Sequence, residues 1–490
     1  MDATRVIDDF RPVGVVIGRL SAVLGLTMLV PAGLDLWEGD ANGEAMAVSA
    51  ALTWVIGSAL VTACRVGAGE QTGLTRRQAF LLTTLVWAVL PLFGCLPFML
   101  GAPGAGFTDA YFEAMSGLTT TGATVFEGLD TAPAGMLLWR GMLQWFGGVG
   151  IVVVAIVFLP ALRIGGMQFF RSESFDLSGD ILPRATELAG SLSWVYVALT
   201  GACMLAYAAV GLEPFDALVH AMTTVATGGF ANYDRSFQDM PEASHWVAVV
   251  FMWLAALPFI RYIQLAGGRP QPLLRDPQIR TFLAIAIGSS AVIAISIVLR
   301  DVHEPLNAVR EALFNTTSVM TGTGYASDPY DKWGGLAVGL LFILALIGGC
   351  TGSTSCSGKV FRYEVLLAAL AVQIRRIHSP NTVYLLRYDG RAVDSEVVTS
   401  IMGFFFVFFS ALGLWSVLLS LQGLDFLAAV SASVAALCNL GPGLGPDVGP
   451  EGNYRSMPDT AKWLMSAGML LGRLEFLSAL VILSPLFWRR

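Results

Sequence analysis

The sequence predicts an all-α integral membrane protein that encloses one pore. Of its 490 residues 55% are hydrophobic and 13% are charged, whereas about a quarter of the residues are charged in a typical soluble domain. Ten apolar stretches are long enough to cross a bilayer, which takes about 20 residues. Four shorter apolar segments lie between them, and a glycine turn follows each one. These observations predict ten transmembrane helices and four re-entrant pore helices.

The ten predicted spans alternate between two kinds of loop. They cover residues 12–34, 45–65, 79–101, 135–160, 186–212, 244–266, 278–300, 335–370, 396–422 and 461–487. Arginines gather at 65–77, 163–184, 269–280 and 362–391, and acidic residues at 35–44, 127–130, 234–242, 328–331 and 447–459. Basic loops stay on the cytoplasmic side of a membrane. We therefore expect both termini to be cytoplasmic, and the acidic start MDATRVIDDFRP predicts no cleavable signal.

The four short segments predict helices that enter the membrane without crossing it. They read FTDAYFEAMSGL, FDALVHAMTTVA, LNAVREALFNTTSVM and LDFLAAVSASVAAL, and they lead into the turns TTTGAT, ATGGFAN, TGTGYAS and CNLGPGLG. Non-helical backbone at membrane depth is tolerated only beside protein or a watery cavity. Carbonyls and hydroxyls in such turns can replace the water shell of a cation. One such turn alone could equally be an external loop, but four equivalent copies favour a shared pore.

This order of elements divides the chain into an additional helix pair and four pseudo-repeats of helix, pore helix, filter and helix. The predicted divisions are 1–67 for the N-terminal pair, 68–165 for repeat one, 166–270 for repeat two, 271–378 for repeat three with an intramembrane gating loop, and 379–490 for repeat four.

Several motifs resemble the Trk/Ktr/HKT superfamily of potassium transport proteins. They are NLGPGLG in the fourth turn, the stretch 144–174 that begins QWFGGVG, GGCTGSTS followed by KVFR, and GRLE with a closing FW. The additional N-terminal helix pair resembles that of the bacterial Trk potassium uptake proteins, the TrkH-like branch of this superfamily. The resemblance implies a potassium-selective, channel-like pore for potassium and rubidium uptake across the cell inner membrane. It further implies a homodimer gated by a cytosolic, nucleotide-binding, TrkA-like ring.

The family pattern of Thr, any residue and Gly assigns the candidate filter residues. They are Thr120, Thr121 and Gly122; Thr227, Gly228 and Gly229; Gly322, Thr323 and Gly324; and Asn439, Leu440 and Gly441. Turns two and three each contain a second glycine, so the register there stays open. Asn439 and Pro442 depart from the other turns, which leaves strict selectivity for potassium over sodium open while rubidium permeation is expected.

Two elements are candidate gates below the filter. Arg473, in the GRLE context, is expensive at membrane depth by at least ~2.5 kcal/mol, and the resemblance implies that it projects into the pore. The glycine-rich run 348–358 interrupts an apolar span, and in the family the matching segment is a mobile loop. Its candidate residues are Gly348, Gly349, Gly352, Ser353, Thr354, Ser355, Gly358 and the adjacent Lys359. For Arg473 the alternative is pairing with Glu475 or with backbone carbonyls, which would only lock helices together. For the glycine-rich run it is a simple packing kink, and the Lys359 side chain could either anchor the loop or reach the cytoplasm.

Other functional classes receive little support from the sequence. The six cysteines and four histidines form no metal-binding spacing, and no Walker A, dinucleotide or HExxH motif is present. We therefore predict a protein that is not an enzyme, needs no cofactor, binds no nucleic acid and binds only K⁺ at the filter. The main alternative is a proton- or sodium-coupled potassium symporter with broken-helix sites. Its few candidate acids are Glu113, Asp216 and Glu475.

Overall fold

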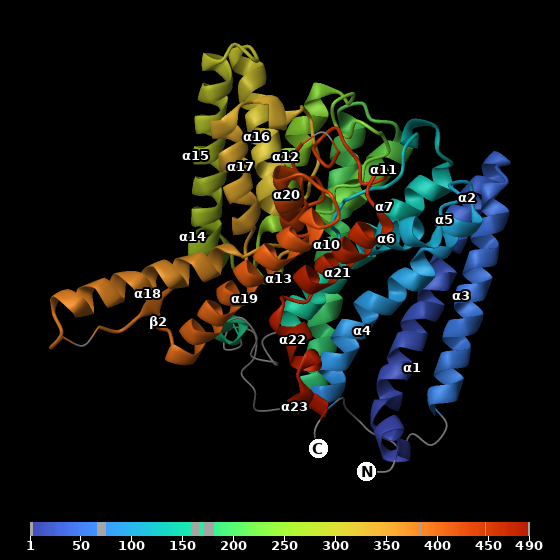
Figure 1. The fold of residues 1–490 in the computed structure, drawn as a ribbon, viewed down its shortest axis with the longest axis horizontal. Helices are drawn as coiled ribbons and strands as arrows, with labels where there is room; N and C mark the ends of the chain where they lie inside the picture. Colours follow the sequence, from blue (N-terminus) through green and yellow to red (C-terminus); the bar gives the residue numbers. More distant parts are fainter. Residues whose placement is uncertain are drawn as a thin grey trace.

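The computed structural model describes residues 3–65, 75–158, 166–170, 181–382, 384–445 and 447–488, and these residues are mostly helical (Figure 1). Within the described residues, the only strands are β1 (Arg387–Tyr388) and β2 (Arg391–Ala392), which form an antiparallel hairpin. Residues 159–165 and 171–174 of the stretch noted above, including Arg163 and Arg171 of a basic loop, lie outside the described residues. Helix α1 begins and α23 ends at the same end of the molecule (Figure 1).

The N-terminal pair consists of one stretch formed by α1 (Ala3–Thr27) and α2 (Leu29–Glu38), and a second formed by α3 (Asn42–Arg65). A buried carboxylate joins this pair to the rest of the fold. Asp35 accepts hydrogen bonds from the Asn42 side chain at 2.6 Å and from the backbone N–H of Gly135 at 2.5 Å. Because Gly135 lies in the first turn of α7, Asp35 also satisfies an N–H that has no partner within that helix.

Four blocks of chain follow, each with a long helix, a short helix, a turn and a second helix. Block one contains α4 (Arg76–Gly94), α5 (Leu96–Leu100), α6 (Phe107–Leu118), η1 (Leu129–Thr131), α7 (Ala134–Val153) and η2 (Val154–Phe158), with η3 (Met167–Phe170) after it. Block two contains α10 (Ile181–Ala209), α11 (Pro214–Val225), α12 (Glu242–Ala256), α13 (Phe259–Ala266) and α14 (Gln271–Arg275). Block three contains α15 (Pro277–Leu299), α16 (Pro305–Thr321), η4 (Tyr330–Lys332), α17 (Gly335–Ile347) and α18 (Val360–His378). Block four contains α19 (Ser395–Ser420), α20 (Phe426–Leu437), α21 (Asp459–Arg473), α22 (Leu477–Leu483) and α23 (Pro485–Trp488).

Seven helical stretches among the described residues are long and apolar enough to cross a membrane unaided. They are Phe10–Glu38, Asn42–Arg65, Arg77–Leu100, Ala134–Ile156, Ala189–Ala209, Pro277–Leu299 and Ser395–Ser420. The pair α12 and α13 qualifies jointly but bends by 89° between the two helices. The predicted span 244–266 is therefore not one straight helix. Pro258 explains the bend, because proline has no N–H to donate and forces the residue before it into an extended conformation, as found at Leu257.

Two further predicted spans are discontinuous. The stretch 335–370 is interrupted by non-helical residues between α17 and α18, as the glycine-rich run indicated. The predicted span 461–487 is likewise not one continuous helix, because α21 ends at Arg473 and α22 begins at Leu477. Between them Glu475 and Phe476 have φ values of +54° and +53°. The aromatic rings of Phe404 and Phe408 pack against Phe476 there, so tertiary contacts determine this break.

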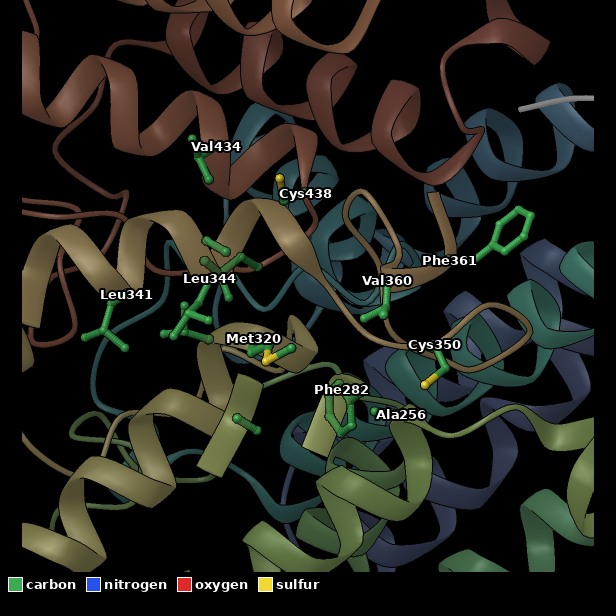
Figure 2. Packing of buried hydrophobic residues seen from close by; sticks show 14 of the residues in the cluster. Ala256, Phe282, Met320, Leu341, Leu344, Cys350, Val360, Phe361, Val434 and Cys438 are labelled. Carbon is green, nitrogen blue, oxygen red and sulfur yellow. The ribbon is translucent and has the colours of Figure 1, made fainter. Parts of the chain in front are cut away.

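A buried apolar cluster, shown at close range in Figure 2, lies beside the breaks between α12 and α13 and between α17 and α18. Cys350 and Val360, from either side of the loop between α17 and α18, lie near Ala256 and Phe282 from α12 and α15. Met320 and Cys438, at the ends of the short helices α16 and α20, belong to the same cluster. The cluster therefore packs the loop against the base of the turns.

Candidate ion pore

Each short helix ends in the same hydrogen-bonded turn. The residue that leaves the helix has a positive φ, with values of +54° for Thr120, +49° for Thr227, +77° for Gly322 and +52° for Asn439. The backbone N–H of the following residue donates to the carbonyl five residues earlier, at 2.8 Å in turn one and 2.9 Å in the others. The four pairs are Thr121 with Ser116, Gly228 with Thr223, Thr323 with Ser318, and Leu440 with Ala435. This is a Schellman motif, which prefers glycine at the first position. Three of the four turns place another residue there, at a cost of about 1–3 kcal/mol each.

A second left-handed residue follows two positions later and fixes the register that the sequence left open. Its φ is +84° for Gly122, +81° for Gly229, +85° for Gly324 and +95° for Gly441. Gly229 and Gly324 are therefore equivalent to Gly122, and the neighbouring Gly228 and Gly322 occupy other positions in their turns. Two left-handed residues in each turn redirect the chain away from the short helix. Only glycine adopts the left-handed conformation without strain.

The four turns touch one another in a closed ring. A Cβ added to each glycine would lie less than 3.0 Å from a carbonyl oxygen of the next turn. The pairs are Gly122 with Gly228, Gly229 with Thr323, Gly324 with Leu440, and Gly441 with Thr121. The order runs from turn one through four and back to one, so the four glycines surround a common axis. All four also line one outer cavity of about 190 Å³.

The acidic residues at the mouth of this cavity join outer loops of different blocks. Glu127 pairs with Arg455 at 2.5 Å, and Lys332 pairs with Glu451 at 2.6 Å. The Asp234 carboxylate, from block two, accepts hydrogen bonds from the backbone N–H groups of Gly128 and Leu129 in block one. The Asn453 amide, and then the Arg455 guanidinium, hold the pKa of Glu127 below its usual value. These contacts fasten the loops of the rim to one another.

Polar side chains of α7 hold the turns from behind. Gln144 donates to the carbonyl of Gly228 at 2.5 Å and accepts from the N–H of Phe230 at 3.0 Å. Arg140, one helical turn earlier, pairs with the fully buried Glu113 at 2.9 Å and lies over the Phe230 ring. Neither Gln144 nor Arg140 was singled out from the sequence. For Arg140 the signal was present, because a cation inside an apolar span marks a functional position.

The loop between α17 and α18 lies against the bend between α12 and α13. The N–H of Cys350 donates to Ala256 at 3.0 Å, the Thr354 hydroxyl donates to Ala255 at 3.1 Å, and the N–H of Phe259 donates to Gly352 at 2.9 Å. Buried backbone groups need partners. The two interrupted helices therefore satisfy each other's free backbone groups, which allows both breaks at this depth.

The same loop touches the inner ends of turns three and four. A Cβ on Gly322 would lie 3.7 Å from the N atom of Cys356, and the Ser357 hydroxyl lies 3.5 Å from the carbonyl oxygen of Cys438. Lys359 is buried and donates to the carbonyl of Ser355. Of the two roles considered for Lys359, the structure therefore has the loop anchor, through a carbonyl partner.

Arg473 connects this loop to block one. Its guanidinium donates at 2.8 Å both to the Sγ of Cys356 and to the carbonyl of Gly147, and it lies 5.1 Å from the Trp87 ring. Of the partners considered in the alternative to gating, Glu475 is excluded because it contacts Arg362, whereas a backbone carbonyl, that of Gly147, is present. Arg473 also stands at the end of α21 rather than midway along a continuous helix.

The arrangement of four converging turns has known counterparts. The family model of the TrkH cation transport proteins matches residues 45–489. The chain belongs to the TrkH family. The Trk system potassium uptake protein TrkI of Halomonas elongata is 38% identical over 502 residues, which cover 100% of both chains. The Trk system potassium uptake protein TrkH of Escherichia coli K12 is 36% identical over 487 residues, 98% of this chain and 99% of that one.

A solved structure of a TrkH-family member has the same fold. The crystal structure of the potassium transporter TrkH from Vibrio parahaemolyticus matches with a TM-score of 0.90 at 35% identity, covering 98% of this chain and 100% of that one. Family membership confirms the predicted resemblance and the prediction of a multi-span helical membrane protein. It also identifies the chain as a transport protein rather than an enzyme.

Proposed function

We propose that this protein carries potassium, and also rubidium, into the cell through the axis enclosed by the four turns. The closed ring of contacts among Gly122, Gly229, Gly324 and Gly441 carries the proposal. Backbone carbonyls of the turns, on the twelve filter residues named above, replace the hydration shell of the ion. The names of the TrkI and TrkH relatives, which are potassium uptake proteins, support the choice of ion.

The finer topology belongs to the same proposal. Ten spans cross the bacterial inner membrane, four pore helices re-enter it, the five divisions have the predicted boundaries, and both termini are cytoplasmic. The count rests on joining three broken pairs into single spans, namely α12 with α13, α17 with α18, and α21 with α22. All three breaks lie in the helix that follows the filter turn of its block. Non-helical backbone at membrane depth is tolerated there if it lines a water-filled cavity.

The gate consists of the loop from Gly348 to Lys359 and the guanidinium of Arg473. The contact of Arg473 with Cys356 supports a joint action, since Cys356 itself lies against Gly322 of turn three. A unit charge ~4 Å from a potassium ion costs about 4 kcal/mol at an effective dielectric constant of about 20. Deleting residues 353–355 should remove the steric part of this barrier and raise cation flux.

Regulation comes from a TrkA-like, nucleotide-binding cytosolic ring that docks on a homodimer of this chain. The proposal rests on the Trk system relatives and on basic residues of α18 and the β1–β2 hairpin, Arg375, Arg376, Arg387 and Arg391. Helix α18 projects sideways from the other helices (Figure 1), so its surface is available to a partner. Purified protein that opens and closes fully with nucleotide alone would contradict this part.

Ion-coupled symport remains the second candidate, but the embedded acids favour a channel-like pore. Glu113 is paired with Arg140, and Asp216 accepts from Asn232 and Tyr233 at 2.7 Å each. Both carboxylates thereby serve residues next to the turns, and neither is arranged as a proton relay.

The test combines growth rescue with flux. The gene should restore growth at low potassium to an uptake-deficient bacterium, and purified protein in liposomes should take up radioactive rubidium down its own gradient. Uptake that requires an imposed proton or sodium gradient would favour the symporter. Absence of both rescue and uptake, with folded protein in the membrane, would refute potassium transport.

A further inference from the structure

A second set of equivalent contacts lies just outside the ring. Three residues beyond each filter glycine, the backbone N–H donates to a buried side chain of the preceding short helix. The pairs are Val125 with Glu113 at 2.9 Å, Asn232 with His220 at 3.4 Å, Ser327 with Asn315 at 3.3 Å, and Leu444 with Ser431 at 2.9 Å. The acceptor stands nine residues before the glycine in the first three turns and ten before it in the fourth.

The neighbouring carbonyl is held from the other side. Two residues beyond the glycine, the backbone oxygen accepts a bond from the preceding block in the ring. Thr124 accepts from the N–H of Tyr454 at 2.9 Å, Ala231 from the side chain of Arg140 at 2.9 Å, and Ala326 from the N–H of Phe237 at 3.0 Å. In the first three turns the outer strand is therefore fixed both to its own helix and to its neighbour.

The four acceptors are chemically unlike one another. A carboxylate, an imidazole, an amide and a hydroxyl share only the capacity to accept a hydrogen bond, and all four are buried. An unpaired buried N–H costs about 1–3 kcal/mol, so each acceptor stabilises one position of the strand relative to its helix. Because the strand continues directly from the filter glycine, a shift of the strand would also displace the ring carbonyls.

We propose that Glu113, His220, Asn315 and Ser431 are positioning residues that set the selectivity of the pore for potassium over sodium. Their action is on the strand and not on the ion. This inference rests on the proposed potassium pore and adds to it a set of determinants outside the carbonyl ring.

His220 offers the clearest test. Its Nδ1 lies 2.9 Å from the carbonyl oxygen of Asp216, and a carbonyl only accepts. Nδ1 therefore carries the proton, which leaves Nε2 as the acceptor for the N–H of Asn232. The imidazole ring packs against Tyr233 and Phe237. Substitution by Asn or Leu removes that ring equally, but only Asn supplies an acceptor, and Asn315 already serves this position in turn three.

The experiment compares full-length His220→Asn and His220→Leu with the unaltered protein in liposomes. Rubidium uptake is measured in competition with potassium and with sodium. His220→Asn should keep the discrimination within about twofold, whereas His220→Leu should lower it about tenfold, which corresponds to ~1.4 kcal/mol. Equal discrimination in both variants, either retained or lost, would overturn the proposal.

Hydrogen–deuterium exchange separates this inference from the transport assay. The amide of Asn232 should exchange faster in His220→Leu than in His220→Asn, and equal rates would refute the positioning role even if no sample transported rubidium. Lack of rubidium uptake by the unaltered protein would count against the proposed pore alone. If His220→Leu does not fold, Ser431→Ala tests turn four in the same way. Its control is Ser433→Ala, because Ser433 is equally buried but donates only to the Ala429 carbonyl.

Discussion

Replacing Gly324 by Ala perturbs the ring at one point and leaves its charge unchanged. The residue has a φ of +85°, which costs an L-residue about 1–2 kcal/mol. The new Cβ would also lie less than 3.0 Å from the carbonyl oxygen of Leu440 and 2.8 Å from Cδ of Pro442. Overpacking of this kind typically costs about 1–3 kcal/mol. The two terms together amount to about 2–5 kcal/mol, and displacement of the Leu440 carbonyl relieves the second.

Because that carbonyl belongs to the proposed filter, the variant should lose selectivity. If about 1.4 kcal/mol of the strain is expressed as altered ion discrimination, potassium over sodium selectivity falls tenfold. The assay is rubidium uptake into liposomes with potassium or sodium as competitor. Gly211→Ala is the matched control, because Gly211 has a φ of +98° but nothing within 4 Å of an added Cβ. Unchanged selectivity in Gly324→Ala, or an equal loss in Gly211→Ala, would refute the reasoning.

Three further predictions concern the gate, the support of the filter and the rim. Arg473→Ala should raise rubidium flux about tenfold, since a third of the ~4 kcal/mol Coulomb barrier suffices; flux that falls or stays level in folded protein would show a purely structural role. Glu113→Ala leaves Arg140 buried without its partner and should lower the free energy of unfolding by about 3–5 kcal/mol, measured by denaturant or thermal melting; a loss below 1 kcal/mol would contradict the pairing. Because the pKa of Glu127 is lowered in the folded state, its contacts stabilise the rim above the ordinary carboxyl pKa of about 4 and are lost as the pH falls through the lower folded pKa. The melting temperatures of wild type and Glu127→Gln should therefore differ at neutral pH and converge in acid; a difference that widens in acid would contradict the assignment.

Local signals in the sequence account for the parts of the fold that were predicted well. The short helices α6, α11, α16 and α20 lie within a few residues of the predicted segments, because each joins an apolar run to a glycine turn. The interruption after Ile347 was equally readable, since glycine and hydroxyl residues hold a helix poorly. The bend at Pro258 followed a recognisable proline that the prediction passed over.

Long-range contacts determine the rest. No glycine or proline occupies the break from Leu474 to Phe476, although Gly472 lies in the last turn of α21. The break therefore also depends on the packing of Phe476 and the pairing of Glu475 with Arg362. The partners of Arg473 lie 117 and 326 residues away in the chain, beyond the reach of any local pattern. The common role of the four acceptors Glu113, His220, Asn315 and Ser431 was not visible in the sequence, because they share hydrogen bonding to the strand without sharing a residue type.

The central claim is that cations occupy the axis between the four turns, and anomalous diffraction from crystals grown with rubidium tests it most directly. Rubidium should appear on the axis between the carbonyls of Thr121, Gly228, Thr323 and Leu440, the oxygens that face the glycine of the preceding turn in the ring. Excess potassium should remove the signal. An empty axis at saturating rubidium, or rubidium bound only between the blocks at another depth, would contradict the account.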